Sequence, residues 1–150
     1  MNSIAILGAG TWGIALAKML KNTNKNVTVW SALPDEIEAL SKTSRHPKLP
    51  NVLLPKGIEY TTDIKSAVEN KDIIMFAVPS VFVRQTARKC KDYIKDNQII
   101  VDVAKGIEPD TLFTLTQVID DEIKNNTVKY VALSGPTHAE EVSRDMPTTI

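Results

Sequence analysis

The chain has 150 residues, a length that fits one domain, and it is 43% hydrophobic and 24% charged, as is typical of an ordinary globular protein. Eighteen basic residues balance eighteen acidic ones. A protein that holds nucleic acid by its phosphates normally carries a basic excess or a basic patch. Because the sequence has neither, we expect no nucleic-acid partner.

Features of a membrane or secreted protein are also missing. The longest apolar run, residues 73–78, is far shorter than the roughly 20 residues that cross a bilayer. No Lys or Arg precedes Lys18, so the sequence lacks the charged start of a signal peptide. The single cysteine, Cys90, cannot form an internal disulfide. We therefore predict a cytoplasmic protein without membrane insertion.

Short apolar runs rich in Ile and Val alternate with segments of helical period. We predict strands at Ser3–Leu7, Val27–Trp30, Asp72–Val78, Gln98–Val103 and Val128–Leu133. Continuously apolar strands are typical of a parallel sheet that is buried on both faces. Their alternation with helices predicts the α/β class, with a doubly wound, mostly parallel sheet.

Three helical segments are predicted from apolar residues that recur at intervals of three and four. Their shared faces are Gly13, Ala17 and Leu20, then Val83, Ala87, Cys90 and Ile94, and then Leu112, Leu115, Ile119 and Ile123. Since Cys90 lies on such a face, we expect it to pack in the core rather than to react.

The least regular segment is residues 43–57, which contains Pro47, Pro50, Pro55 and Gly57. Proline removes a backbone donor and disfavours helix in the residue before it, so the segment is predicted to be a loop. At about 15 residues it is longer than most connections, which favours a functional role such as a flap over a ligand.

The last five residues, 146–150, favour extended structure. We expect them to begin a further strand, and we expect the natural chain to continue beyond Ile150.

The strongest local motif is a G-x-G-x-x-G pattern formed by Gly8, Gly10 and Gly13, which follows a predicted strand and opens a predicted helix. In a dinucleotide site the first glycine permits the tight turn, the second lets the backbone approach a pyrophosphate, and the third lets helix and strand pack closely. Free N–H groups near Thr11 and Trp12 would then face the phosphates. The alternative is a glycine-rich turn without a ligand.

The end of the second strand usually indicates which dinucleotide is bound. An acid there favours NAD, and a basic residue accommodates the 2′-phosphate of NADP. Here the sequence is Trp30-Ser31-Ala32-Leu33, which is neither. Asp35 and Glu36 are predicted to begin the next helix, where acids suit the N-terminus. The choice between NAD and NADP is left open.

Two further strand ends can line a ligand, because the crevice of an open α/β sheet lies beyond the carboxyl ends of its strands. Pro79 lies in the turn after the third predicted strand, and Ser80 can cap the following helix. Lys105 follows the next strand, where its ammonium group can bind phosphate or a carbonyl oxygen. The alternatives are a plain structural turn and a solvated surface lysine.

A last segment of interest is Ser134–Glu141. Thr137 and Glu140 have the spacing of a capping box, which predicts a helix start with N–H groups that suit an anion, or a cap without a ligand. His138 and His46 are interpreted as loop residues. The spacing of Asp, His and Cys indicates no metal site.

Four segments together resemble the N-terminal half of bacterial-type NAD(P)-dependent glycerol-3-phosphate dehydrogenases. They are Gly8-Ala-Gly-Thr-Trp-Gly13, Ala77-Val-Pro-Ser80, Ala104-Lys-Gly-Ile-Glu108 and Ser134-Gly-Pro-Thr-His-Ala-Glu-Glu141. The first occurs in many dehydrogenases, whereas the last two together are fairly specific. The resemblance covers the whole chain and implies a Rossmann-like dinucleotide-binding domain over residues 1–150.

This resemblance implies an activity: the interconversion of sn-glycerol 3-phosphate and dihydroxyacetone phosphate with NAD or NADP, in glycerophospholipid biosynthesis. It implies that Thr11, Trp12 and Ala139 contact the cofactor, and that Gly135 and Thr137 contact the substrate. Lys105 would lie between cofactor and substrate and orient the latter. For the full-length protein a homodimer is expected.

The sequence departs from the family in two ways. The family often has a basic residue just after the strand-two Trp, where this chain has Ala32 and Leu33. The principal catalytic lysine of the family belongs to a helical domain that would begin after Ile150, so we expect this chain to bind the dinucleotide weakly and to be inactive alone. Alternatives are a related hydroxyacid or nucleotide-sugar dehydrogenase, or a non-catalytic dinucleotide-binding regulatory module.

Overall fold

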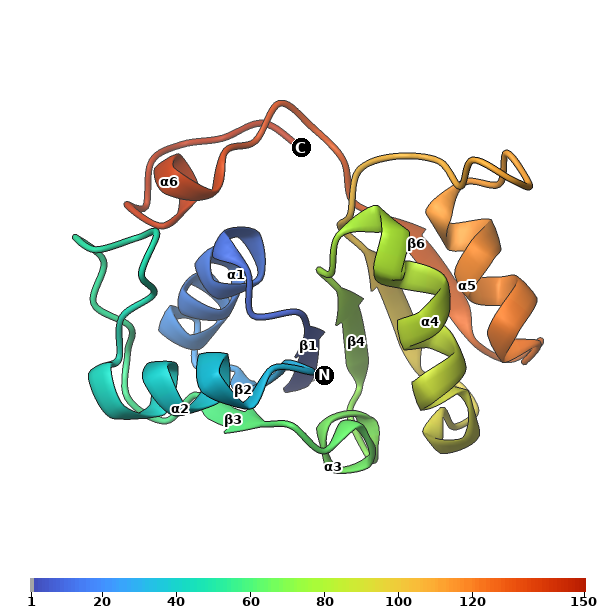
Figure 1. Ribbon diagram of the computed structural model, residues 1–150, viewed down its shortest axis with the longest axis horizontal. Coiled ribbons are helices and arrows are strands. Elements are labelled where there is room, and N and C mark those ends of the chain that lie inside the picture. Colours follow the sequence, from blue (N-terminus) through green and yellow to red (C-terminus); the bar gives the residue numbers. More distant parts are fainter. Residues whose placement is uncertain (1) are drawn as a thin grey trace.

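The computed structural model describes residues 2–150 and has a single parallel sheet flanked by helices (Figure 1). The strands are β1 (Ser3–Leu7), β2 (Asn26–Trp30), β3 (Glu59–Thr61), β4 (Ile73–Phe76), β5 (Ile99–Asp102) and β6 (Lys129–Ala132). All six pair in parallel, in the order β3-β2-β1-β4-β5-β6. This is the doubly wound, Rossmann-like order, so the predicted fold class is confirmed.

Helices cover both faces of the sheet. They are α1 (Thr11–Asn22), α2 (Pro34–Thr43), α3 (Ile64–Val68), α4 (Ser80–Cys90), α5 (Leu115–Ile123) and α6 (Ala139–Val142), with a short 3-10 turn at Lys91–Tyr93. One core packs α1, part of α2 and the loop after it against the sheet, and the other packs α3, α4 and α5. Within residues 2–150, none of the helices has the length and apolar character needed to cross a membrane.

Two predictions about strands were wrong. The edge strand β3 was missed, because it is only three residues long and half-exposed instead of continuously apolar. Residues 146–150 form no strand and are exposed. They lie against Gly135, where the Thr149 carbonyl oxygen would be 2.6 Å from an added β-carbon, and not along a strand edge that could pair with them.

Helix starts differ from the predictions as well. Leu112 is 71% exposed with φ +59°, and α5 begins later, after a capping box between Thr114 and Gln117. The predicted capping box at Thr137 is absent: Thr137 is buried, the N-cap of α6 is His138, and no side chain caps it. Ser80 is the first residue of α4 and does not cap it. A helix of four residues has little dipole, so α6 offers no strong anion site.

The proline-rich loop is confirmed, but it is anchored. Leu49, Val52 and Leu54 are buried in the core beneath it, and the Leu54 N–H donates to the Ser44 carbonyl at 2.9 Å. A flap that swings as a whole would have to expose these apolar side chains to water. The structure therefore argues against the mobile flap.

Candidate functional site

The glycine turn between β1 and α1 is built as the motif predicts. Gly8 has φ +127°, and an added β-carbon there would lie 2.6 Å from the Ala77 carbonyl oxygen. At Gly13 the β-carbon would lie 2.1 Å from the Gly8 carbonyl oxygen. At Gly10 it would meet nothing within 4 Å. The outer two glycines are thus required by packing, and the middle one leaves backbone open to a ligand.

A pocket of about 400 Å³ lies at the carboxyl ends of β1, β4 and β5. It brings together most of the residues predicted for the site: Gly10, Thr11, Trp12, Pro79, Lys105, Thr137 and Ala139. Gly13 lies beneath this pocket and not in its wall, and Gly135 packs against the end of the chain. Segments far apart in sequence therefore meet at one end of the sheet, as the strand-end rule predicts.

Lys105 lies on the loop after β5. Its Nζ donates to the Thr137 carbonyl oxygen at 3.4 Å, which links this loop to the segment before α6. The loop itself is fixed by Asp102, whose Oδ1 accepts the Ala104 N–H at 3.0 Å. Asp102 is only 6% exposed, and burial raises the pKa of its carboxyl to about 6. Lys105 is thus presented from a loop with a defined course.

The segment that carries Ala139 is held against α1 (Figure 1). The Lys18 Nζ donates to Oδ2 of Asp145 at 2.6 Å, and the Lys18 side chain is 13% exposed. The Thr137 N–H donates to the Gly135 carbonyl at 2.9 Å. The ion pair holds the segment after α6 against the second half of α1, and Thr137 and Ala139 line the pocket with Thr11 and Trp12.

A second pocket, of about 350 Å³, continues past Gly10 toward the end of β2. It is lined by Gly8, Trp30 and Ser31–Leu33 on one side, and by Pro79, Phe82 and Lys89 on the other. Because the two pockets share Gly10 and Pro79, they adjoin one another, and together they are called the groove at the carboxyl end of the sheet. Such a groove fits a two-part ligand with its pyrophosphate at the glycine turn.

Comparison with known proteins agrees with this geometry. Residues 3–150 match the sequence model of the family described as NAD-dependent glycerol-3-phosphate dehydrogenase N-terminus. The chain belongs to this family. The resemblance noted from its motifs is therefore confirmed, as is an NAD(P)-dependent family.

Two relatives show how much of the whole protein the chain represents. It is 60% identical over 154 residues to glycerol-3-phosphate dehydrogenase (NAD(P)+) 2 of Lactobacillus delbrueckii subsp. bulgaricus, covering 100% of this chain and 46% of that protein. A glycerol-3-phosphate dehydrogenase crystal structure from Coxiella burnetii superimposes with a TM-score of 0.90 at 30% identity, covering 98% of this chain and 45% of that one. The chain thus spans about half the length of its relatives.

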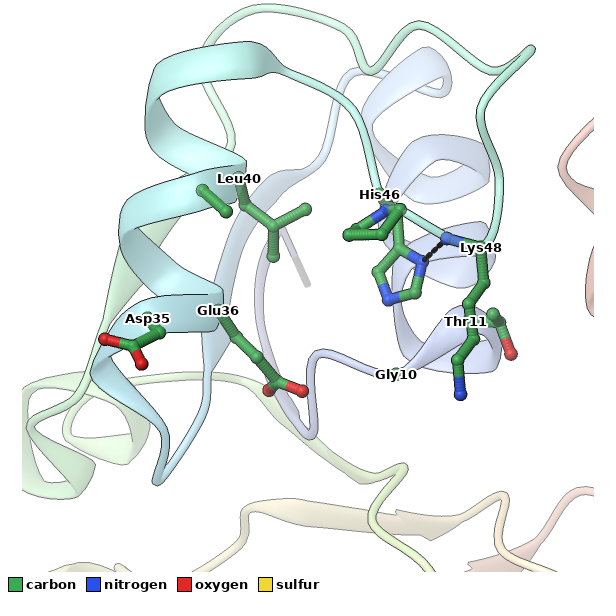
Figure 2. A pocket seen from close by; sticks show the side chains of 9 residues that line it. Gly10, Thr11, Asp35, Glu36, Leu40, His46 and Lys48 are labelled. Carbon is green, nitrogen blue, oxygen red and sulfur yellow. Dashed lines mark hydrogen bonds between the residues drawn. The ribbon is translucent and has the colours of Figure 1, made fainter.

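The chain has a third pocket, of about 440 Å³, between α2, the start of α1 and the proline-rich loop (Figure 2). His46 and Lys48 enter it from the loop, and Glu36 enters it from α2. His46 is buried, and its Nδ1 accepts the Lys48 N–H at 3.2 Å. Burial lowers the pKa of His46, and the nearby Glu36 carboxylate acts in the opposite direction.

The sequence analysis did not predict this third pocket. It interpreted His46 as a loop residue without a role and did not single out Lys48. The available signal was the unusual length of the loop.

Cys90 packs in the core, whereas His138 lines the pocket that contains Lys105. Cys90 is buried, and burial raises the pKa of its thiol to about 12, so it packs and is unsuited to be a nucleophile. His138 is exposed at the start of α6. Among residues 2–150, no three His, Cys, Asp or Glu side chains are grouped so that they could hold a metal ion.

Proposed function

We propose that this chain forms the dinucleotide-binding part of a cytoplasmic enzyme that interconverts sn-glycerol 3-phosphate and dihydroxyacetone phosphate with NAD or NADP. In glycerophospholipid biosynthesis this reaction provides the lipid backbone. The observation that carries the proposal is the groove at the carboxyl end of the sheet. The open backbone of Gly10 lines it together with Pro79, Lys105 and Ala139.

The cofactor half of the site follows from the glycine turn. Gly10 leaves room for a pyrophosphate. Thr11 and Trp12 are the first residues of a helix of 12 residues, and their backbone N–H groups lie at its positive end, which favours an anion. Pro79 and Ala139 line the wall that a nicotinamide ring would reach. The bound dinucleotide supplies the hydride; the chain binds it, orients it and excludes water around it.

The substrate half is smaller. Lys105 offers a positive point charge for the substrate oxygens, and its link to the Thr137 carbonyl shows that its ammonium group reaches across the pocket. We infer that Lys105 orients the substrate and that Thr137 lines its binding site, whereas the role of Gly135 rests on the family resemblance alone. The chain spans 46% of its Lactobacillus relative, so we also propose that the principal catalytic lysine and most of the substrate phosphate site belong to the rest of the protein.

Energy transfer from tryptophan to bound NADH or NADPH tests the proposal directly, because Trp12 and Trp30 both line the groove. We expect saturable binding by the 150-residue chain and no reduction of dihydroxyacetone phosphate. The full-length protein should reduce dihydroxyacetone phosphate in the same assay. Binding without any such reduction by the full-length protein would instead support a different dehydrogenase or a regulatory module.

A further inference from the structure

The end of β2 lacks the basic residue that would hold a 2′-phosphate. Ala32 and Leu33 are exposed, and Leu33 is 57% exposed at the rim of the groove. Neither side chain can donate a hydrogen bond or carry a charge. A cofactor with a phosphate at this position would therefore find no cation on the β2–α2 connection.

A carboxylate reaches this position from α2. Glu36 lies in the first turn of α2, and its Oε2 accepts the Ser31 hydroxyl at 2.6 Å. The Ser31 Oγ in turn accepts the Leu33 N–H at 3.1 Å, and Ser31 is buried. This chain of hydrogen bonds ties the Glu36 carboxylate to the end of β2, although the residue itself belongs to the helix.

The Glu36 side chain also faces the ligand groove. It lines the pocket that contains Trp30 and Leu33, and it lines the neighbouring pocket beside Gly10. Figure 2 shows its carboxylate pointing into that pocket. Dinucleotide folds usually place an acid at the end of the second strand, where it accepts hydrogen bonds from the ribose hydroxyls of NAD and repels the 2′-phosphate of NADP.

We propose that Glu36 determines cofactor specificity and makes this domain prefer NAD(H) to NADP(H). The inference rests on the proposed dinucleotide function and deepens it. The carboxylate, positioned by Ser31, accepts hydrogen bonds from the ribose hydroxyls in the adenosine half of the cofactor. A 2′-phosphate would bring its negative charge against the same carboxylate, and like charges at close range are destabilising.

Two lysines lie near Glu36, and neither belongs to the β2–α2 connection. Figure 2 shows Lys48 entering from the loop, with its ammonium group beside Gly10 and Thr11 and away from the Glu36 carboxylate. It faces the pyrophosphate position, which NAD and NADP share. Lys89 reaches the groove from the last turn of α4 and not from the β2–α2 connection.

Parallel titrations of the chain with NADH and NADPH test the proposal. We expect wild type to bind NADH more tightly by about tenfold. Glu36→Gln keeps an oxygen that accepts the Ser31 hydroxyl but removes the charge, and we expect it to raise NADPH affinity and bring the ratio close to one. Glu38→Gln is the matched control, because Glu38 lies on the same helix, is exposed and pairs with Lys42 outside the pockets. It should leave the ratio unchanged.

A second variant keeps the test decisive if Glu36→Gln folds poorly. Ala32→Arg adds a cation at an exposed position next to the carboxylate and should raise NADPH affinity selectively. Equal or tighter NADPH binding by wild type, or an unchanged ratio in a folded Glu36→Gln protein, would overturn the role of Glu36 while leaving dinucleotide binding intact. Saturable binding of neither nucleotide by a folded sample would overturn the proposed function, and with it this inference.

Discussion

The guanidinium group of Arg84 donates two hydrogen bonds to the Glu108 carboxylate, from Nε to Oε1 and from Nη2 to Oε2, each 2.7 Å long. Its Nη1 also donates to Asp121 at 2.6 Å and to Glu122 at 2.9 Å. Arg84 lies on α4, both other acids lie on α5, and Glu108 follows Lys105 by three residues. One side chain thus ties the loop that presents Lys105 to two helices.

Removing this cation should change how stability depends on pH. Arg84 holds the pKa of Glu108 at about 2, and Arg88 and Arg84 together hold the pKa of Glu122 at about 2. A carboxyl whose folded-state pKa is depressed stabilises the fold above its unfolded-state pKa, and this stabilisation is lost as the pH falls toward 2. We expect Arg84→Ala to be less stable than wild type at pH 7, with the difference shrinking between about pH 4.5 and pH 2.

Urea unfolding followed by tryptophan fluorescence at a series of pH values measures this difference. Lys42→Ala is a suitable control, because the Lys42 and Glu38 side chains pair in the open, and such pairs contribute little. A stability difference between wild type and Arg84→Ala that stayed constant from pH 7 to pH 2 would contradict the prediction.

Alanine substitutions at Gly13 and at Gly10 should have different effects on stability. Gly13→Ala places a β-carbon 2.1 Å from the Gly8 carbonyl, which backbone cannot accommodate without moving, so we expect a loss of about 3 kcal/mol in the free energy of unfolding. At Gly10, φ is −67° and the β-carbon meets nothing, so Gly10→Ala should cost less than about 1 kcal/mol.

NADH binding should also distinguish Gly10→Ala from Gly13→Ala. The β-carbon of Gly10→Ala would occupy the space through which a pyrophosphate approaches, so NADH affinity should fall by about tenfold in a protein that remains folded. Thermal unfolding and NADH titration of both variants provide the two measurements. A stable Gly10→Ala protein with wild-type affinity would show that the pyrophosphate does not bind at this turn.

At Asp102 the free energy of unfolding should depend on pH with the opposite sign to that at Glu108 and Glu122. Burial raises the pKa of its carboxyl to about 6, so the folded state holds a proton that the unfolded state has released between about pH 4 and pH 6. Stability from this group is present below that window and is lost as the pH rises through it. Asp102→Asn keeps an oxygen for the Ala104 N–H and removes the titration.

We therefore expect Asp102→Asn to gain stability relative to wild type between pH 4 and pH 7, by about 2 kcal/mol. Chemical unfolding of both proteins at pH 4 and at pH 7 measures this gain. Asp96→Asn offers a comparison on the surface, where hydrogen bonds from Asn125 and Thr127 lower the pKa of the acid, so its substitution should shift stability in the other direction. Equal stability differences at both pH values would exclude a buried titrating Asp102.

The fold was predictable because its central strands are continuous apolar runs. β1, β4 and β5 are buried almost throughout, so composition alone indicates them. β3 was not predicted because Glu59–Thr61 lies at the sheet edge and is half-exposed, and an edge strand needs no apolar run. Its existence depends on pairing with β2, which is a tertiary contact.

The structure brings together the candidate residues that follow strands, because a parallel sheet places the carboxyl ends of its strands side by side. Gly10, Pro79 and Lys105 follow strands, and the topology brings them together. His46 and Lys48 reach the third pocket because Leu49, Val52 and Leu54 fold the loop back onto the core, and no local pattern encodes that path. Glu36 was correctly placed at a helix start, but its bond to Ser31 depends on the geometry of the β2–α2 turn.

Lys48 gives a last prediction, which complements that for Glu36. Its side chain lines the third pocket together with Gly10 and Thr11 (Figure 2), and we expect its ammonium group to contact the pyrophosphate common to both cofactors. Lys48→Gln should therefore weaken NADH and NADPH binding equally, by about fivefold, which is the effect of a partly exposed ion pair of about 1 kcal/mol. The ratio of the two affinities should not change. Lys56→Gln is the control, because Lys56 is exposed in the same loop and lines none of the three pockets. A selective loss of NADPH affinity in Lys48→Gln would mean that this lysine contacts the 2′-phosphate, and that the loop, rather than α2, governs the choice of cofactor.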